Sequence, residues 1–508
     1  MMLNILQINP LIILFFVLFA YIGLFMVFYI FFFKILFRFF KIFLVINLCF
    51  LFFIQGLMAY IWINFDTFLL VTEYNQGFQY FFFYEVNSLY NIVFCFGLDG
   101  FSLLFILLTV FIFSLCSFIT LYLNSSIFFQ LSLFIVLIIL EFILIFVFSV
   151  LDLFFFYIGF ESSLIPMFFI VGLWGARSRR IKATFYLFLY TMFTALLTLT
   201  SIFYTLMQTG STFYSDILNF NFTEIEQKIL WLCLFLTFAT KIPIIPFHIW
   251  LPEAHVEAPT IGSVILASIL LKSGGFGFLR YLIPIFPFGT NYYLPFVYML
   301  SLCSIIYASL TTIRQFDLKR IIAYSSIAHM NMVVLGLFCN NIQGVEGAFY
   351  LMLGHGIVSS ALFLLVGVVY ERYHTRIIRY YGGLTVVMPI FSFFYFIFSL
   401  GNIGFPGTSN FIGEFLILVG VFNKNVFISF FLGFGIILSG VYTMWLYNRL
   451  FFGTLKINYG FYFVDLTKKE FYLFFFLGFI MVNLGINSNL IIDFLCLNIE
   501  QYLLLCFY

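Results

Sequence analysis

The chain has 508 residues, of which 64% are hydrophobic, 24% aromatic and only 8% charged, and its formal net charge is +2. Soluble domains carry about 25% charged residues, so this composition excludes a water-soluble globule, a disordered chain and a nucleic-acid-binding protein. Phenylalanine alone supplies 83 residues, spread over the whole length. The composition therefore predicts an integral membrane protein with nearly all of its chain in the bilayer.

Apolar runs of about 20 residues, the length that crosses the hydrocarbon core, recur from end to end. They predict an all-α polytopic membrane protein with about fourteen transmembrane helices, near residues 10–33, 42–62, 101–123, 127–149, 151–173, 183–207, 229–251, 260–282, 293–312, 321–339, 344–370, 385–421, 426–453 and 470–490. The stretch 65–100 is more polar, and we expect it to lie outside the membrane.

Basic residues fall at alternate connections between these helices. Seventeen of the 22 Lys and Arg follow odd-numbered spans, in clusters at 34–41, 177–182, 314–320, 372–379 and 449–469. Positively charged loops stay on the cytoplasm-like or matrix side of a membrane. We therefore expect the clusters on that side and both termini on the opposite side.

Two segments resemble each other and indicate an internal repeat. ATFYLFLYT (183–191) aligns with GAFYLMLGH (347–355), and Pro243 and Pro406 are separated by nearly the same offset. Both offsets advance by five spans, and an odd shift inverts the topology. We predict helices 1–3 in 1–126, a first five-helix repeat in 127–282, an inverted second repeat in 293–453, and a loop, last helix and tail in 454–508.

Two of the predicted helices are interrupted near mid-membrane. KIPIIPFHIWLP (241–252) carries three prolines, and GNIGFPGTSN (401–410) carries a proline between glycines. Proline removes a backbone donor and clashes with the preceding turn, so both helices should open. Broken helices at repeat-related positions are typical of ion or substrate sites in transporters. The alternative is a pair of proline kinks without function.

Four ionisable residues lie inside predicted spans, namely Glu161, Lys241, Lys272 and Glu414. A charge at the bilayer centre costs roughly 2.5–3.5 kcal/mol, which favours a function for each. A Glu161–Lys241 pair that forms and breaks would load and release a proton. Lys272 would carry the proton next, and Glu414 would be the exit group. The alternative is a set of static ion pairs that fix helix contacts.

Four histidines are candidates for a proton relay: His248, His255, His329 and His355. His329 and His355 fall within apolar spans, where a neutral imidazole that bridges waters can conduct protons. The alternative for each is a core histidine with satisfied hydrogen bonds.

The remaining polar groups give weaker indications of function. Glu141 and Asp152 are either proton-uptake groups or surface charges, and Asp317 with Arg314, Lys319 and Arg320 is interpreted as a structural ion cluster in a loop. The eight cysteines lack the spacing of a metal or iron–sulfur site, so we expect no cofactor or metal in this chain. The chain also lacks a P-loop, which excludes ATP hydrolysis.

Long segments of the chain resemble a known family. FESSLIPMFFIVGLWGARSRRIKATFYLFLYT, KIPIIPFHIWLPEAHVEAPTIGSVILASILLKSGGFGFLR, FDLKRIIAYSSIAHMN and GFPGTSNFIGEF are similar to the chain 4 family of mitochondrial NADH:ubiquinone oxidoreductase, respiratory complex I. WLPEAHVEAP is similar to chain 4 rather than to the sister antiporter-like chains 2 and 5. The resemblance covers roughly 95–490, so contacts made by 1–95 and 491–508 remain open.

The resemblance implies a fourteen-helix, antiporter-like, proton-pumping subunit without a cofactor, in a complex whose other subunits use FMN, iron–sulfur clusters, NADH and ubiquinone. It implies that the pumping residues fall on Glu161, Lys241, Lys272 and Glu414. It also implies the sister chains and membrane lipid as partners, and the mitochondrial inner membrane as location. The phenylalanine excess and the lack of a targeting segment favour an organelle-encoded chain.

We therefore expect a proton-translocating subunit of NADH:ubiquinone oxidoreductase, driven by quinone reduction elsewhere in the complex. The first alternative is a stand-alone cation/proton antiporter subunit of the same fold. The second is a scaffold that only fills the membrane arm.

Overall fold

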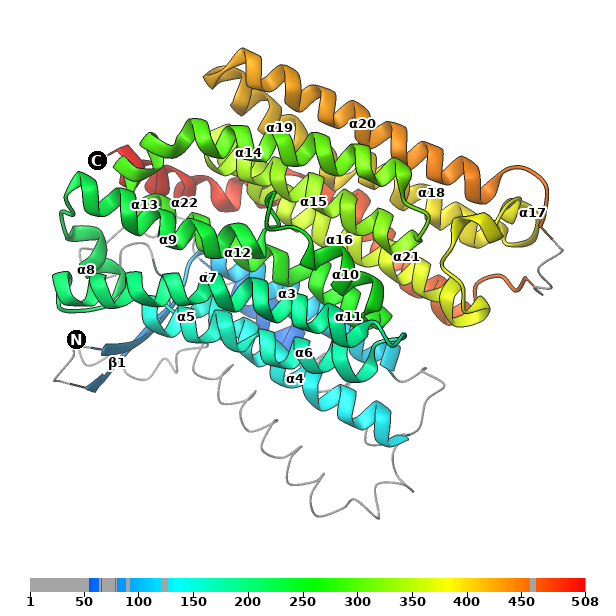
Figure 1. Cartoon of the computed structure of the whole chain (residues 1–508), viewed down its shortest axis with the longest axis horizontal. Helices are drawn as coiled ribbons and strands as arrows, with labels where there is room; N and C mark the ends of the chain where they lie inside the picture. The colour runs from blue at the N-terminus through cyan, green and yellow to red at the C-terminus, as the bar shows by residue number, and fades with distance from the viewer. Residues whose placement is uncertain are drawn as a thin grey trace. The chain divides into compact units, whose positions relative to one another are not determined.

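The structure is a computed structural model that describes residues 54–63, 65, 78, 80–87, 92–120, 127–456 and 463–507. The chain divides into two compact units. Figure 1 labels their helices and strands. The first unit comprises Met1–Trp174 and Ala195–Thr223, and the second comprises Gly175–Thr194 and Glu224–Tyr508. The predicted span 10–33 and most of 42–62 lie outside the described residues.

Ten helices in the described ranges are long and apolar enough to cross a membrane, which agrees with the composition. They are Gly100–Thr120, Phe128–Ser149, Leu153–Trp174, Arg180–Thr209, Thr260–Ile285, Pro287–Arg314, Leu318–Leu337, Ile342–Tyr373, Val426–Phe451 and Lys468–Ile486. The chain is thus a mostly helical membrane protein.

The first unit combines a hairpin with apolar helices. Its elements are a short helix Ile54–Ile63, β1 (Tyr80–Asn87), β2 (Ile92–Leu98), α3 (Gly100–Thr120), α4 (Ile127–Ser149), α5 (Leu153–Ser162), α6 (Leu164–Trp174), the second half of α7 (Arg180–Thr209) and α8 (Tyr214–Asn219). The prediction of a purely helical chain is wrong at β1 and β2, which pair antiparallel. Their aromatic and β-branched residues favour strands over a helix.

Two acids are buried in this unit. Asp152 is the N-cap of α5: Oδ1 accepts from the backbone N–H groups of Phe154 and Phe155, and Oδ2 accepts from the Thr212 hydroxyl at 2.7 Å. Glu141 lies within α4 and is only 2% exposed. Burial excludes the surface-charge alternative for both, because a surface charge would be solvated.

The second unit holds the remaining helices. Its elements are the first half of α7, α9 (Glu224–Lys241), α10 (Trp250–Glu257), α11 (Thr260–Ile265), the π-turn η1 (Leu266–Leu270), α12 (Leu271–Gly277), the π-turn η2 (Phe278–Leu282), α13 (Ile283–Ile285), α14 (Pro287–Arg314), α15 (Leu318–Leu337), α16 (Ile342–Tyr373), η3 (Ile378–Tyr380), α17 (Leu384–Val387), α18 (Pro389–Ile403), α19 (Ser409–Lys424), α20 (Val426–Phe451), α21 (Lys468–Ile486) and α22 (Asn489–Phe507). The long helix α16 is central, since it packs against α11, α15, α18, α19, α21 and α22.

Both predicted interruptions are present in this unit. The first separates α9 from α10 between Lys241 and Trp250, and the second separates α18 from α19 between Ile403 and Ser409. Each gap replaces part of a helix with irregular backbone, as prolines and glycines in the two segments require.

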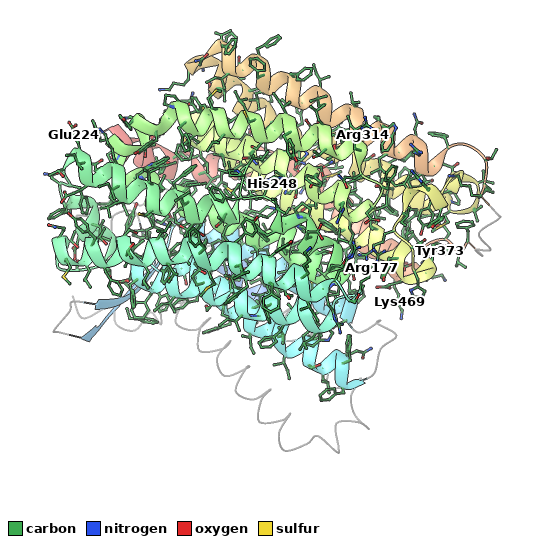
Figure 2. The ribbon with its side chains drawn as sticks, viewed as in Figure 1. Arg177, Glu224, His248, Arg314, Tyr373 and Lys469 are labelled. Carbon is green, nitrogen blue, oxygen red and sulfur yellow. The ribbon has the colours of Figure 1, made fainter. Side chains whose placement is uncertain are left out.

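Several charged groups of the second unit lie toward its ends. Figure 2 shows Arg177, Arg314 and Lys469 toward one end of this unit and Glu224 toward the other, with His248 between them. We call the end with Arg177, Arg314 and Lys469 the basic side. The separation matches the alternation of basic loops in the sequence.

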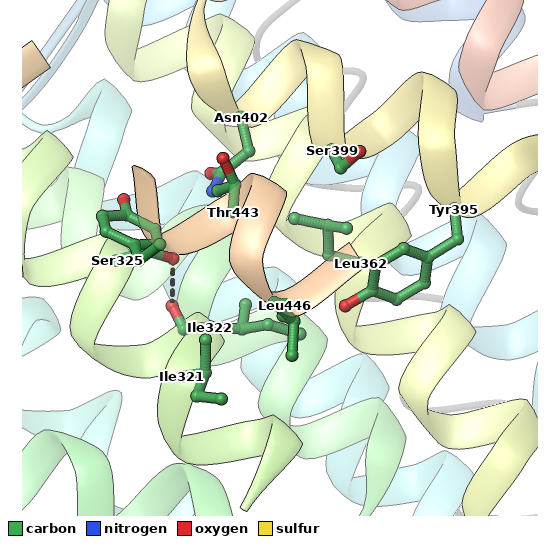
Figure 3. A pocket seen from close by; sticks show the side chains of 10 residues that line it. Ile321, Ile322, Ser325, Leu362, Tyr395, Ser399, Asn402, Thr443 and Leu446 are labelled. Atoms are coloured by element: carbon green, nitrogen blue, oxygen red, sulfur yellow. Dashed lines mark hydrogen bonds between the residues drawn. The ribbon is translucent and has the colours of Figure 1, made fainter. Parts of the chain in front are cut away.

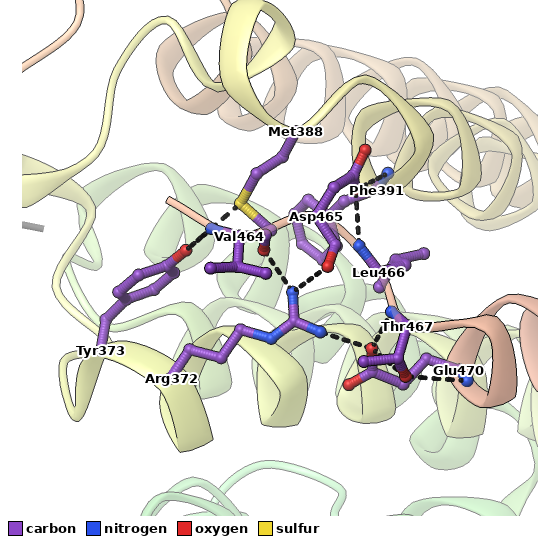
Figure 4. A network of polar contacts seen from close by, with 9 residues as sticks. All are labelled: Arg372, Tyr373, Met388, Phe391, Val464, Asp465, Leu466, Thr467 and Glu470. Carbon is purple, nitrogen blue, oxygen red and sulfur yellow. Dashed lines mark hydrogen bonds and ion pairs between the residues drawn. The ribbon is translucent and has the colours of Figure 1, made fainter. Parts of the chain in front are cut away.

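A polar network on the basic side anchors the chain between α20 and α21 (Figure 4). The Arg372 guanidinium at the end of α16 donates to the Asp465 carbonyl at 3.0 Å and pairs with Glu470. The Asp465 carboxylate accepts from the backbone N–H groups of Ile390 and Phe391, at 2.9 and 3.0 Å, and so caps α18. The helix that leads into the second interruption is therefore fixed at its start.

Candidate functional site

Four buried ionisable side chains from four helices of the second unit form a line. The Lys272 Nζ on α12 lies 2.9 Å from the His355 Nδ1 on α16. The His355 ring lies 5.5 Å, between centroids, from the ring of His329 on α15. The His329 Nδ1 lies 3.2 Å from the Glu414 Oε1 on α19. All four are at most 4% exposed. We call this set the buried line.

Irregular helix geometry positions the first member of the buried line. Lys272 is the second residue of α12, just after η1 ends at Leu270, and its ammonium donates to the Ala267 carbonyl inside that π-turn. The second π-turn, η2, begins after α12 ends at Gly277. π-turns inside α-helices widen the backbone and occur often at functional sites. Here the turn supplies a carbonyl partner for an otherwise costly buried lysine.

Lys241 lies beside the helix that carries Lys272. It is the last residue of α9 and is 3% exposed. A Cβ built at Gly274 of α12 would lie 3.1 Å from the Lys241 Cβ, so the two helices are in close contact there. Lys241 therefore lies both at the first interruption and next to α12.

The first interruption is fixed by side chains that bind its free carbonyls. The Trp250 indole N–H donates to the Thr240 carbonyl at 2.8 Å. The Asn331 amide of α15 donates to the Pro243 carbonyl at 3.3 Å. Because unpaired backbone groups are costly away from water, these two contacts stabilise the open helix next to Lys241.

The other two predicted histidines lie outside the buried line. The His248 ring lies within the first interruption and packs against the rings of Tyr307 and Tyr324, at 5.5 and 6.4 Å. The His255 ring stacks on Phe363 at 4.7 Å. The buried line thus includes two of the four predicted relay histidines.

Glu161 belongs to the first unit, whereas Lys241 belongs to the second. Glu161 follows Phe160 in α5 and is half-buried. Its predicted pairing with Lys241 stays a prediction.

The second interruption gathers buried polar groups around Glu414. The Glu414 carboxyl group turns back toward Gly404, whose added Cβ would lie 2.4 Å from the Glu414 Oε2. The Asn410 amide and the Ser409 hydroxyl, next to Gly354 of α16, have no protein hydrogen-bond partner although both are buried. Buried polar atoms of this kind are ordinarily satisfied by ordered water.

Sequence reasoning placed one cluster wrongly and missed part of it. Lys319 was predicted to lie in a loop, but it lies in the first turn of α15. Its side chain is 1% exposed, and its Nζ lies 2.8 Å from the Ala258 carbonyl. Arg376, also 1% exposed, donates to the Val256 carbonyl. Burial, and then Arg177, lower the pKa of Arg376 below its ordinary value.

This cluster binds the C-terminal end of α10. The backbone N–H of Ala176 donates to the Glu257 carbonyl at 3.1 Å, so three successive carbonyls from Val256 to Ala258 each have a donor. Cations at a helix C-terminus also interact favourably with the helix dipole. Only the repeated basic residues of the loop sequences pointed to this region.

Among the residues that the structure describes, no group of His, Cys, Asp or Glu is arranged to hold a metal ion. The chemistry that this geometry offers is proton transfer. The buried line consists of an amine, two imidazoles and a carboxyl group, each of which can both bind and release a proton.

Comparison with known proteins agrees with this chemistry. The family described as NADH:quinone oxidoreductase/Mrp antiporter, TM, matches residues 150–440. NADH-ubiquinone oxidoreductase chain 4 of Chondrus crispus is 50% identical over 84% of this chain and 88% of the relative. This chain belongs to the NADH-ubiquinone oxidoreductase chain 4 family.

Further members of the chain 4 family and one solved structure agree. The chain 4 protein of Acanthamoeba castellanii is 49% identical over 90% of this chain and 91% of its own length. A chain of respiratory complex I from Thermus thermophilus with bound NADH is 26% identical, with a TM-score of 0.80, over 90% of this chain and 94% of that chain. Similarity therefore extends through both units of the chain.

Proposed function

We propose that this chain is a proton-translocating subunit in the membrane arm of a respiratory NADH:ubiquinone oxidoreductase. The observation that carries the proposal is the buried line, in which four ionisable groups come together in an apolar unit. The two ends of the line, Lys272 and Glu414, are more than a hundred residues apart in the sequence. Membership of the chain 4 family supports the same function. Electrons would pass through other subunits, and this chain would move protons.

Proton movement along the buried line needs three short transfers. At 2.9 Å, the Lys272 ammonium can give a proton to the His355 Nδ1. The centroids of the two imidazole rings are 5.5 Å apart, and one water molecule could link a nitrogen of each ring. His329 can then protonate Glu414, which lies 3.2 Å away. Each transfer exchanges one N–H or O–H bond for another, so no redox partner is needed in this chain.

Lys241 and Glu161 would drive this movement. We propose that a Glu161–Lys241 pair forms and breaks as quinone is reduced elsewhere in the complex. When the pair breaks, the positive charge on Lys241 repels a proton on nearby Lys272, because like charges disfavour each other in an apolar setting. Contact between the helices of Lys241 and Lys272 at Gly274 supports this coupling. His248 and His255 would relay protons beside the line.

We further propose a fourteen-helix topology with two inverted five-helix repeats. The ten apolar helices, the two interrupted helices and the predicted N-terminal spans support that number. The basic side would face the mitochondrial matrix, in accord with the positive-inside rule. The sister antiporter-like chains and inner-membrane lipid would be its neighbours, and the chain would be encoded in the organelle.

A stand-alone cation/proton antiporter is the second candidate, because the matching family includes Mrp antiporters. It would exchange Na⁺ for H⁺ without electron-transfer partners. A pure scaffold is a weaker candidate, because a scaffold gains nothing from four buried ionisable groups that each cost free energy. Na⁺/H⁺ exchange by the isolated chain in vesicles would favour the antiporter.

The test replaces Lys272 with methionine, which is unbranched and only one heavy atom shorter but cannot carry a proton. In membranes whose complex assembles normally on a native gel, we expect NADH:quinone turnover and proton pumping to fall together by at least about tenfold. Lys228→Met is the matched control, because Lys228 is half-exposed on α9 and packs over the Tyr292 ring. Near-normal pumping by the assembled Lys272→Met complex would overturn the proposed function.

A further inference from the structure

The last turn of α21 packs directly on the second interruption. A Cβ built at Gly485 would lie 2.2 Å from the Gly407 carbonyl oxygen and 2.7 Å from the Thr408 carbonyl carbon. Real Cβ atoms do not approach backbone atoms this closely, so the contact requires a glycine at this position. The backbone of α21 therefore touches the backbone that leads from α18 into α19.

The same face of α21 follows the end of α18. A Cβ added to Gly401, in the last turn of α18, would lie 2.5 Å from the sulfur of Met481, one turn before Gly485. One turn earlier again, the contact is looser: a Cβ added to Gly478 would lie 3.8 Å from the Phe398 ring. The fit between the two helices thus becomes tighter toward the interruption.

A buried tyrosine fixes the end of α21. The last four carbonyls of a helix have no partner within it, and Leu484 is one of these residues because α21 ends at Ile486. The Leu484 carbonyl accepts a hydrogen bond from the hydroxyl of Tyr350, which is buried on α16. α16 also carries His355 of the buried line and packs against α19. The hydroxyl therefore joins the end of α21 to this central helix.

Another side of the same helix end is less tightly packed. Ser399 and Asn402 of α18 line a small cavity that α15, α16 and α20 complete (Figure 3). The last turn of α18 has space beside it there, whereas α21 touches both Gly401 and the backbone beyond it. The contact with α21 is thus the tighter constraint on the position of the interruption.

We propose that the last turn of α21 fixes the position of the second interruption, and that Gly485 and Tyr350 are positioning residues for Glu414. This inference rests on the proposed function. Glu414 lies against Gly404, three residues before Gly407, so a displacement of Gly407 moves the backbone that Glu414 contacts. Both positioning residues act through this backbone, and neither exchanges the transported proton.

The titratable groups around Glu414 belong to helices other than α21. Helices α15, α16, α18, α20 and α21 pack against α19. The groups that these helices bring toward Glu414 are His329 of α15, at 3.2 Å, Tyr442 of α20, and His355 of α16, beside His329. α18 carries no Asp, Glu, His, Lys or Arg, and those of α21 lie in its first turn, at 468–470. A changed pH dependence after substitution in the last turn of α21 therefore reports a displaced Glu414 and not a lost charge.

The first experiment replaces Gly485 with alanine in the assembled complex. It measures NADH:quinone turnover and proton pumping from about pH 6 to about pH 9. The methyl group must displace Gly407, so we expect a loss of about fivefold at pH 7 and a pH optimum moved by at least about half a unit. Gly478→Ala is the matched control, because its methyl group has room on the same face of α21, and it should keep the original activity and pH profile.

The second experiment removes the Tyr350 hydroxyl and decides the matter if Gly485→Ala does not assemble. Tyr350→Phe keeps the ring but leaves the Leu484 carbonyl without its donor. The last amides of α21 should exchange hydrogen faster, and the pH optimum should move in the same direction, with a smaller loss of about twofold. Tyr472→Phe, at an exposed position near the start of α21, should change neither.

The outcomes separate this inference from the proposed function. If Lys272→Met abolishes pumping while Gly485→Ala and Tyr350→Phe keep the original turnover and pH profile, α21 does not position Glu414, and the buried line stands. If the two variants lower only the Tm, and the assembled complex keeps its pH profile, both residues are structural and the inference fails. A moved pH optimum in either variant, absent from both controls, supports it. Normal pumping by Lys272→Met would overturn the proposed function itself.

Discussion

The two interrupted helices of the second unit differ in what opens them and in what surrounds them. Prolines open the first, and most of its residues from Lys241 to His248 are buried or half-buried. Glycines with left-handed backbone open the second, at Gly404 (φ +77°) and Gly407 (φ +91°), and Phe405 between them is 52% exposed. One gap is thus enclosed by protein and the other lies at the surface of the unit.

The partners of the free backbone groups differ as well. In the first gap, Trp250 and Asn331 bind carbonyls and so fix the backbone beside Lys241. In the second, an ionisable side chain, Glu414, turns back against Gly404. The comparison indicates that side chains from other helices fix the backbone of the first gap beside Lys241, whereas in the second gap the carboxyl group of Glu414 lies directly against a glycine of the break.

The largest effect should come from Gly404→Ala. An alanine Cβ at this position would lie 2.4 Å from the Glu414 Oε2, and its left-handed backbone would cost about 1–2 kcal/mol. We expect displacement of Glu414 and a loss of coupled turnover of at least about tenfold. NADH:quinone turnover and the Tm of the assembled complex measure both effects.

Substitutions at two other glycines distinguish the effect of backbone strain from the effect of displacing Glu414. Gly407→Ala meets no atom within 4 Å but has the same left-handed backbone, so it should lower the Tm and largely preserve turnover. Gly433 of α20 has open space around it, and Gly433→Ala should change neither. If Gly404→Ala turned over as fast as Gly407→Ala, the position of Glu414 against the break would have no part in pumping.

Trp250→Phe should have an intermediate effect at the first gap. It leaves the buried Thr240 carbonyl without its indole donor, which costs about 1–3 kcal/mol of stability. The Tm of the assembled complex should fall, and turnover should fall less than in Gly404→Ala. Trp445→Phe, at a half-exposed position on α20, is the control, and equal Tm values for the two variants would contradict a fixed first gap.

The smallest effect should come from Asp465→Ala, which removes the cap of the helix that enters the second gap. Loss of an N-cap costs about 1 kcal/mol, so α18 should fray at Ile390 and Phe391. Hydrogen exchange of these amides should become faster. Asp493→Ala, at an exposed position on α22, should leave their exchange unchanged; slow exchange in both variants would show that the cap is dispensable.

Much of the buried line was predictable from the sequence. Lys272, Glu414, His329 and His355 stand out because ionisable residues are costly in apolar spans, and this cost depends on each residue and its immediate neighbours. Tyr350 and Asn331 gave no such signal, since a tyrosine or an asparagine in an apolar helix is common. Their roles depend on what other helices bring next to them.

Lys319 illustrates the limit of local reasoning. Its sequence, with Asp317 and Arg320 close by, is typical of a solvated loop, yet the first turn of α15 buries it against the end of α10. The hairpin of β1 and β2 was also missed, because the stretch 65–100 was interpreted only by its polarity, as a segment outside the membrane, and its strand-favouring residues were not considered.

By itself, the sequence determined the membrane environment, the two interruptions and the ionisable residues, because apolar length, proline sterics and burial cost act over a few neighbouring residues. Only the tertiary structure decided which of these residues meet. Lys272 and His355 are 83 residues apart, and their contact depends on the packing of η1 against α16 and of α12 against α15. Such long-range contacts arise from the combined fit of many side chains, which no short segment encodes.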